Sequence, residues 1–331
     1  MAKKEPCCEK FKTMIGGQAL IEGIMMRGPV KDAIVIRTAD GLTVEVSERK
    51  IYPSKSWKNF LFIRGVFGFF DAQVTGVKAL MRSAELAPEE MQEEPSKFDL
   101  WLEKKLGNER FQQAVTGIAV AMGLGLSIVL FFLLPMVIGG FFDRWLTNTL
   151  TLNLVEGFIR MVIFMSYMLL VSRMGEMKRV FAYHGAEHKT IRCYEACLPL
   201  TVENVRKQTR MHPRCGTSFL LVVMVISILV FSVASTALLA VYPGLEIMRG
   251  SFLYRLVMIV FKLLLLPLVV GITYEINRWV GRNDNWFTAL LSAPGLWMQN
   301  FTTNEPDDSM IEVAIAAVEA VLPEEEGADR W

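Results

Sequence analysis

The sequence predicts a mainly α-helical membrane protein with about four transmembrane helices and a small β-containing cytosolic unit at its N-terminal end. Three observations favour this class. The 331 residues are 52% hydrophobic, more than is usual in a soluble domain. Four apolar runs follow one another between residues 115 and 276, each as long as the roughly 20 residues that cross a bilayer. The charged start of the chain leads into no apolar segment, so no cleavable signal peptide is predicted.

Residues 1–57 predict the β-containing unit. Two short β-branched runs, 33–38 and 42–47, are separated by Ala39, Asp40 and Gly41. An Asp-Gly pair between two such runs is a strong hairpin signal. The glycines clustered between residues 16 and 28 predict tight backbone turns, and they lack the spacing of a phosphate-binding loop.

Residues 58–112 predict an amphipathic helix followed by an acidic linker. The helix, expected over 58–84, carries one narrow polar stripe surrounded by apolar and small residues; the stripe consists of Arg64, Asp71, Thr75, Lys78 and Arg82. Such a helix could cross the bilayer, lie in its interface or pack against other helices. Because both flanks are predicted on the same side of the membrane, we expect an interfacial or re-entrant helix.

The four apolar runs predict two transmembrane hairpins, one in residues 113–172 and one in residues 216–277. The expected spans are 115–142, 151–172, 216–245 and 255–276. Three charged residues interrupt them. Glu156 and Arg160 lie four apart, so they could pair on one helix face. Lys262 lies deeper, and Asp71 or Glu156 could supply its counter-charge. Ionisable groups at membrane depth are functional candidates by default.

Loop charge predicts the orientation. Residues 173–216 contain nine Lys or Arg residues, whereas 143–153 and 246–255 contain one and two. The positive-inside rule then places the loop 173–215 and both termini in the cytoplasm. The expected location is the inner membrane of the cell. The cytoplasm is reducing, so thiols in the loop would remain available as ligands. The segment 278–331 is cytosolic in this topology, and Ser309 to Glu312 resembles a capping box that opens an acidic tail helix through Leu322.

The loop 173–215 contains all three histidines and three of the five cysteines of the chain. His184, Glu187 and His188 form an H-x-x-E-H sequence. On a helix, two histidines four residues apart share one face, which suits two imidazoles on one metal ion. The same order occurs in inverzincin metallopeptidases, where the glutamate is the general base. The motif predicts a divalent metal, zinc by ligand type, with Glu187 as the catalytic residue.

The remaining ligands stay open at this point. His212 or Cys215 is the expected third ligand. Cys193 and Cys197 are further candidates, because they lie four residues apart and could pair on one helix face. Glu22 would reach the loop from outside it. Glu195 returns to the helix face of His188 but lies about 10 Å along the helix axis from it. A closed set of four would indicate structural zinc, and three ligands with an open position would indicate catalysis. In the simplest alternative the imidazoles only bond backbone and lipid headgroups, and the cysteines are small core residues.

Four separated blocks of the chain resemble the YqhQ-like family of bacterial multi-pass membrane proteins. They are GGQALIEGIMMRGP (16–29), YHGAEHKTIRCYE (183–195), HPRCGTSFL (212–220) and PGLWMQNFTTNEP (294–306). Members are classed as a domain of unknown function and as predicted metal-dependent enzymes. The resemblance implies a membrane location and a metal site at His184, Glu187 and His188, with His212 and Cys215 as further members. It implies no particular reaction.

Two functions from different classes are therefore expected. The first is a metal-dependent hydrolase or peptidase that acts at the cytoplasmic membrane surface. The second is a non-enzymatic scaffold or assembly factor whose His/Cys metal cluster only holds the loop together. A small-solute transporter fits less well, because the central spans lack a matched pair of broken polar helices. Membrane lipids and other membrane or cytosolic proteins are the expected partners, and no nucleic acid is expected at a net charge of +1.

Overall fold

The computed structural model describes residues 11–49, 56–87, 108–142, 145–146, 148–248, 251–283, 285–325 and 327–330. The acidic linker expected over 85–110 lies mostly outside these ranges. The chain divides into two compact units. One unit contains Met1–Glu89, Met168–Val223 and Pro267–Trp331, and the other contains Glu90–Tyr167 and Met224–Leu266.

The first unit contains an antiparallel meander of four strands in the order β1-β2-β3-β4. The strands are β1 (Gly16–Leu20), β2 (Gly23–Arg27), β3 (Lys31–Thr38) and β4 (Gly41–Glu48). The β3–β4 hairpin confirms the Asp-Gly prediction, because Thr38 lies opposite Gly41, whose φ of 127° favours glycine. The tight turns expected from the glycines of 16–28 are found only at residues 21–22 and after Arg27, since the other residues form β1 and β2. Gly23 serves close strand packing, because a Cβ there would collide with the Val35 carbonyl of β3.

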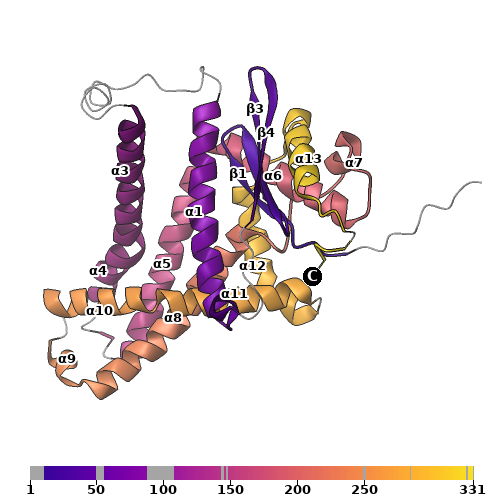
Figure 1. Ribbon diagram of the computed structural model, residues 1–331. Coiled ribbons are helices and arrows are strands. Elements are labelled where there is room, and N and C mark those ends of the chain that lie inside the picture. The colour runs from indigo at the N-terminus through magenta and orange to yellow at the C-terminus, as the bar shows by residue number, and fades with distance from the viewer. Residues whose placement is uncertain are drawn as a thin grey trace, which may run out of the picture. The chain divides into compact units, whose positions relative to one another are not determined.

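Helices cover both faces of this sheet (Figure 1). The helices α6 (Gly175–Glu195) and α13 (Asp308–Val321) bury one face, and α1 (Ile63–Leu86) packs against the other. Alternation along β2 explains the division. Ile24 and Met26 point into the core shared with α6 and α13, whereas Met25 packs against Ala79 of α1.

The polar stripe predicted on α1 makes ion pairs inside the first unit. Arg64 binds Glu275, Asp71 binds Arg27, and Arg82 binds Glu45. Asp71 is therefore not the counter-charge of Lys262. Apolar side chains elsewhere on the helix remain exposed, among them Phe70, Val74 and Val77. The interfacial placement of this helix stays a prediction.

The acidic tail forms the expected helix, which packs against β2 and β3, but the predicted cap is wrong by two residues. Asp307, not Ser309, is the N-cap of α13, and its side chain accepts a hydrogen bond from the Met310 N–H. The Ser309 hydroxyl instead donates to Asp307 Oδ1 at 2.6 Å. Asp and Ser are both good caps, so the backbone at the start of the helix decided between them.

Four helical segments are long and apolar enough to cross a membrane, which confirms the expected number of spans in the described residues: Gly117–Gly140, Leu150–Val171, Gly216–Val241 and Phe252–Arg282. They are formed by α3 (Asn108–Ile128) with the π-helical η3 (Val129–Leu133) and α4 (Leu134–Gly140), by α5 (Thr149–Val171), by α8 (Gly216–Val241), and by α10 (Phe252–Leu264) with α11 (Leu266–Arg282). Shorter elements are η1 (Trp57–Asn59), α7 (Val202–Arg206), α9 (Gly244–Ile247) and α12 (Trp286–Thr302). The described elements of the second unit are all helices, and their exposed side chains are mostly apolar.

Candidate metal centre

His184, Glu187 and His188 lie in the middle of α6. Glu176 in the first turn of this helix and Arg192 in the last turn both suit the helix dipole. The three residues occupy one face because they are three and four positions apart. The two imidazole rings are 4.4 Å apart between centroids. The H-x-x-E-H sequence thus becomes a compact set of side chains on one buried helix face.

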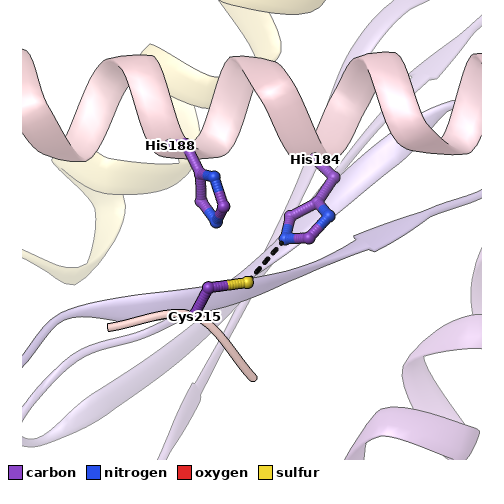
Figure 2. A group of neighbouring side chains, drawn as sticks. All are labelled: His184, His188 and Cys215. Carbon is purple, nitrogen blue, oxygen red and sulfur yellow. Dashed lines mark hydrogen bonds between the residues drawn. The ribbon is translucent and has the colours of Figure 1, made fainter. Parts of the chain in front are cut away.

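Cys215 completes this set from the residue that precedes α8. Its Sγ lies 3.2 Å from His184 Nε2. Ligand atoms of His184, His188 and Cys215 all lie within 4.8 Å of one another, and Figure 2 shows the three side chains converging on one point. A group of two nitrogens and one sulfur at this spacing could hold a metal ion.

Backbone carbonyls orient both imidazoles. His184 Nδ1 lies 2.8 Å from the Thr302 oxygen, and His188 Nδ1 lies 2.6 Å from the Arg210 oxygen. A carbonyl only accepts, so each Nδ1 carries the proton and each Nε2 keeps its lone pair when the ring is neutral. His188 Nε2 is buried and has no hydrogen-bond partner among the described residues. Outer bonds of this kind are typical of metal-ligating histidines.

Glu187 interacts electrostatically with all three residues of this group, and one of its carboxylate oxygens has no partner among the described residues. Its Oε1 accepts a hydrogen bond from the Gly17 N–H at 2.9 Å, while Oε2 is buried without a partner in the described part of the chain. The residue is 4% exposed. Burial raises the pKa of the Glu187 carboxyl, although both neighbouring histidines oppose this change. Gly17 is needed for the approach, because a Cβ there would lie 3.0 Å from Glu187 Cδ.

The charges in the group favour a thiolate. Burial raises the pKa of Cys215, but His184 and His188 outweigh it and bring this pKa well below its usual range. Burial lowers the pKa of His184, yet the Cys215 thiolate prevails and raises it to about 9. These two directions favour an imidazolium–thiolate pair. A divalent ion that replaced the proton would find a ready thiolate.

A metal ion fits these residues. The buried unpaired Nε2 of His188 and the unpaired Oε2 of Glu187 are atoms that a nearby cation or its water would satisfy. Imidazole and thiolate donors suit zinc better than magnesium or calcium, which prefer oxygen. Three ligands would leave a fourth position open.

His212 lies next to His188, outside the group of three, and Glu195 lies next to His212. His212 Nε2 lies 3.4 Å from Glu195 Oε2, and its ring centroid lies 5.5 Å from that of His188. Burial lowers the pKa of His212 to about 4, so the ring is neutral at pH 7. Glu195 also accepts from the Thr13 N–H and pairs with Arg214. Of the two alternatives for the third ligand, the geometry therefore favours Cys215 over His212.

The other candidate ligands are engaged elsewhere. The Cys193 thiol is buried against Val205 and Ile311 and lies near the carbonyls of Leu198 and Pro199, which is a core position. Cys197 is disulfide-bonded, so it has no thiolate to offer a metal, and the expectation that the thiols of this loop stay reduced is wrong for Cys197.

Glu22 is occupied as well. It lies in the turn after β1 and binds Arg179 through both oxygens at 2.6 Å, and it also accepts from the Tyr183 hydroxyl at 3.1 Å. Glu22 therefore tethers the β1–β2 turn to α6 through Arg179 and Tyr183.

Sequence reasoning missed the groups that orient the motif. Gly17 binds Glu187, and the carbonyls of Arg210 and Thr302 bind the histidines. A backbone group leaves no residue-type signal, because any residue has a carbonyl. The only pointer was positional: residues 17 and 302 lie in blocks that carried the family resemblance.

The charged residues of the candidate spans form a separate polar cluster in the second unit. Lys262 Nζ lies 2.6 Å from Glu156 Oε2, and both residues are buried. The expected Glu156–Arg160 pair is thus replaced by Glu156–Lys262, one of the two counter-charges considered for Lys262. Arg160 donates from Nε to the Phe131 carbonyl at 2.6 Å and stacks over Phe132 and Phe231.

Comparison with known proteins settles the family. A model described as a protein of unknown function (DUF1385) matches residues 60–324. The chain belongs to the DUF1385 family. It is also 32% identical over 327 residues to the uncharacterized protein YqhQ of Bacillus subtilis (strain 168), covering 95% of this chain and 93% of that protein. The YqhQ-like resemblance is thereby confirmed. No solved structure matches the chain, and family membership brings no reaction with it.

Proposed function

We propose that the chain is a metal-dependent hydrolase at the inner face of the bacterial inner membrane. His184, His188 and Cys215 hold a divalent metal, with zinc favoured by the donor types, and Glu187 is the general base. The observation that carries the proposal is the buried Oε2 of Glu187, which has no hydrogen-bond partner among the described residues, in a carboxyl that interacts electrostatically with all three soft donors. A purely structural cluster has no need of a free carboxylate oxygen at that position.

Each residue would have a distinct role in the reaction. The bound metal supplies Lewis-acid activation of water and of a substrate oxygen. Glu187 Oε2, which has no hydrogen-bond partner among the described residues, accepts the proton of the attacking water. Its other oxygen stays on the Gly17 N–H, which keeps the carboxylate aimed. The Thr302 and Arg210 carbonyls fix the orientation of the His184 and His188 rings.

The membrane location rests on the four apolar helices, and the proposed orientation rests on loop charge. With loop 173–215 and both termini in the cytoplasm, the site faces the compartment that keeps Cys215 reduced. Membrane lipids are then unavoidable neighbours of the first unit.

A second function is supported by one specific observation. The metal group and its outer bonds join α6, the 210–215 segment and Thr302, so a metal ion there would tie three parts of the first unit together. A non-enzymatic scaffold whose metal only holds this fold is therefore the competing proposal. The two differ in what Glu187 does.

Metal content per purified chain tests the site itself. We expect about one zinc per chain in the wild type and none in the His184→Ala/His188→Ala variant, because two of three ligands are lost. Protein purified without chelator and analysed by elemental mass spectrometry provides the measurement. The matched control is His212→Ala, which should keep its metal. A wild type without metal would refute both proposals.

Glu187→Gln separates enzyme from scaffold. The amide keeps the size of the side chain but cannot take a proton, so we expect full metal content and a loss of hydrolysis by about 10²-fold or more. Turnover would be measured on a panel of fluorogenic peptide and phospholipid esters that the wild type cleaves. If Glu187→Gln retained wild-type turnover, or if only the ligand variants changed protein level, the scaffold would be the better account.

A further inference from the structure

A cavity of about 290 Å³ adjoins the candidate metal centre within the first unit. The start of α8, the last turns of α11 and the middle of α12 form its walls. Cys215 lines it and also belongs to the metal group. A molecule in this cavity would therefore lie directly next to one of the proposed ligands.

Four polar side chains line the cavity without any partner of their own. Tyr274, Asn277, Arg278 and Ser292 make no side-chain hydrogen bond or ion pair with another described residue. Arg278 is the informative member: the residue is half-buried and lies near the charge of Glu275, and its Nε atom is buried with no hydrogen-bond partner among the described residues. A buried donor such as this Nε usually has a partner, and the preferred partners of arginine are carboxylates and phosphates. This set offers donors from four side chains and leaves a place for an anion.

The same cavity has an apolar wall, formed by Phe219, Val222, Ile276, Val280 and Leu291. A free inorganic anion would gain nothing from these side chains, whereas a hydrocarbon chain would bury them. The combination of an unpaired arginine and an aliphatic wall fits an amphiphile with an anionic head.

The position of the cavity indicates the kind of amphiphile. It lies where two candidate spans end, since Gly216 begins one of them and Arg282 ends another. Trp279 and Trp286 nearby are 43% and 78% exposed, as expected of aromatic residues at the level of lipid headgroups. Phospholipid headgroups occupy this level of a bilayer.

We propose that this cavity binds the phosphate headgroup of an anionic phospholipid, with Arg278 on the phosphate and the start of an acyl chain along Phe219 and Val222. That this lipid is the substrate rests on the proposed hydrolase, whereas the binding itself does not. Hydrolysis would add one water across an ester bond and release an acid and an alcohol, so no further reactant is needed.

Lipid binding to the full-length protein in detergent tests the proposal by native mass spectrometry. We expect phosphatidylglycerol to bind at least about tenfold more tightly than phosphatidylcholine, and Arg278→Gln to remove this preference. The matched control is Arg173→Gln, which removes an equal charge from an exposed arginine that follows the span Leu150–Val171. If Arg278→Gln kept the preference, or if Arg173→Gln lost it equally, the site would be wrong.

A second variant tests the apolar wall and keeps the test valid should Arg278→Gln misfold. Val222→Trp fills the cavity, so we expect it to weaken phosphatidylglycerol binding by about tenfold at an unchanged melting temperature. Inorganic phosphate and an acidic peptide serve as competitors. If millimolar phosphate displaced the lipid and Val222→Trp had no effect, the site would bind a free anion and not a lipid. If the peptide alone displaced the lipid, the site would bind a protein ligand.

The His184→Ala/His188→Ala variant separates this inference from the proposed function. We expect it to lose metal and to retain the preference for phosphatidylglycerol. Lipid preference in a wild type that contains no metal would overturn the hydrolase and leave the cavity assignment standing. Metal with no lipid preference would overturn the cavity assignment alone.

Discussion

His184 and His188 each use one ring nitrogen on a backbone carbonyl, and this determines what the other nitrogen can do. His184 has its Nδ1 on the Thr302 carbonyl, which leaves its Nε2 beside Cys215 Sγ. His188 has its Nδ1 on the Arg210 carbonyl, which leaves its Nε2 without a partner among the described residues. Glu187 is divided in the same way between the Gly17 N–H and an unpaired oxygen. The chemistry of the site therefore depends on bonds that lie just outside it.

Glu195 allows a prediction about pH. Burial raises the pKa of its carboxyl, but His212, Arg214 and the Thr13 N–H outweigh this and lower it below its ordinary value. A lowered pKa means that the stabilisation is present above about pH 4.3, the unfolded value, and is lost as the pH falls through the native value. We expect Glu195→Gln to lower stability at pH 7 by about 1–2 kcal/mol.

The difference between Glu195→Gln and the wild type should disappear in strong acid, where both side chains are neutral. Thermal melting of the detergent-purified protein across a pH series measures this. Glu203→Gln, which changes an exposed carboxylate on α7, serves as the control and should melt like the wild type at every pH. A constant difference down to pH 3 would contradict the assignment.

At the scale of elements, the π-helical segment Val129–Leu133 has an identifiable cause. Pro135 has no N–H, so the Phe131 carbonyl four residues earlier loses its ordinary helical donor. Arg160 of α5 supplies a replacement, donating from Nε at 2.6 Å. A side chain of α5 thereby replaces a hydrogen bond that the neighbouring helical segment has lost.

We expect Arg160→Leu to lower stability by about 1–3 kcal/mol, because it leaves a buried carbonyl unpaired. The cost should be smaller in a Pro135→Ala background, where residue 135 can donate again. The four proteins of this double-mutant cycle would be unfolded by titration with a denaturing detergent. Their free energies of unfolding give the coupling between residues 135 and 160. An equal cost of Arg160→Leu in both backgrounds would mean that the arginine acts through its stacking on Phe132 and Phe231 instead.

At the scale of the whole molecule, Glu156 and Lys262, which are 106 positions apart in sequence, pair two candidate spans. Taking one partner away leaves a lone charge among apolar helices. We expect Lys262→Met or Glu156→Met alone to cost about 3–5 kcal/mol, and the double Met variant to be close to the wild type. Unfolding in detergent would show this, with each variant's expression level as a second readout. A double variant as damaged as the single ones would indicate that the charges have a role beyond pairing.

Sequence patterns predicted much of this architecture because their signals are local. Four uncharged or nearly uncharged runs become candidate spans, the Asp-Gly pair becomes the β3–β4 turn, and the acidic tail becomes α13. The clustered glycines were misread as turns, since a glycine that admits a neighbouring strand looks the same in sequence as a glycine that bends the chain. Gly17 and Gly23 are of the first kind.

The sequence by itself determined the class of the protein, the helix that carries the H-x-x-E-H motif and the loop in which soft ligands gather. Only the tertiary structure decided that Cys215 stands beside the two imidazoles, that His212 turns to Glu195, and that Glu22 holds Arg179. The physical reason is the range of the interactions. Periodicity and hydropathy act between residues a few positions apart, whereas a ligand set and the unpaired arginine of a cavity depend on segments that meet only after the chain has folded.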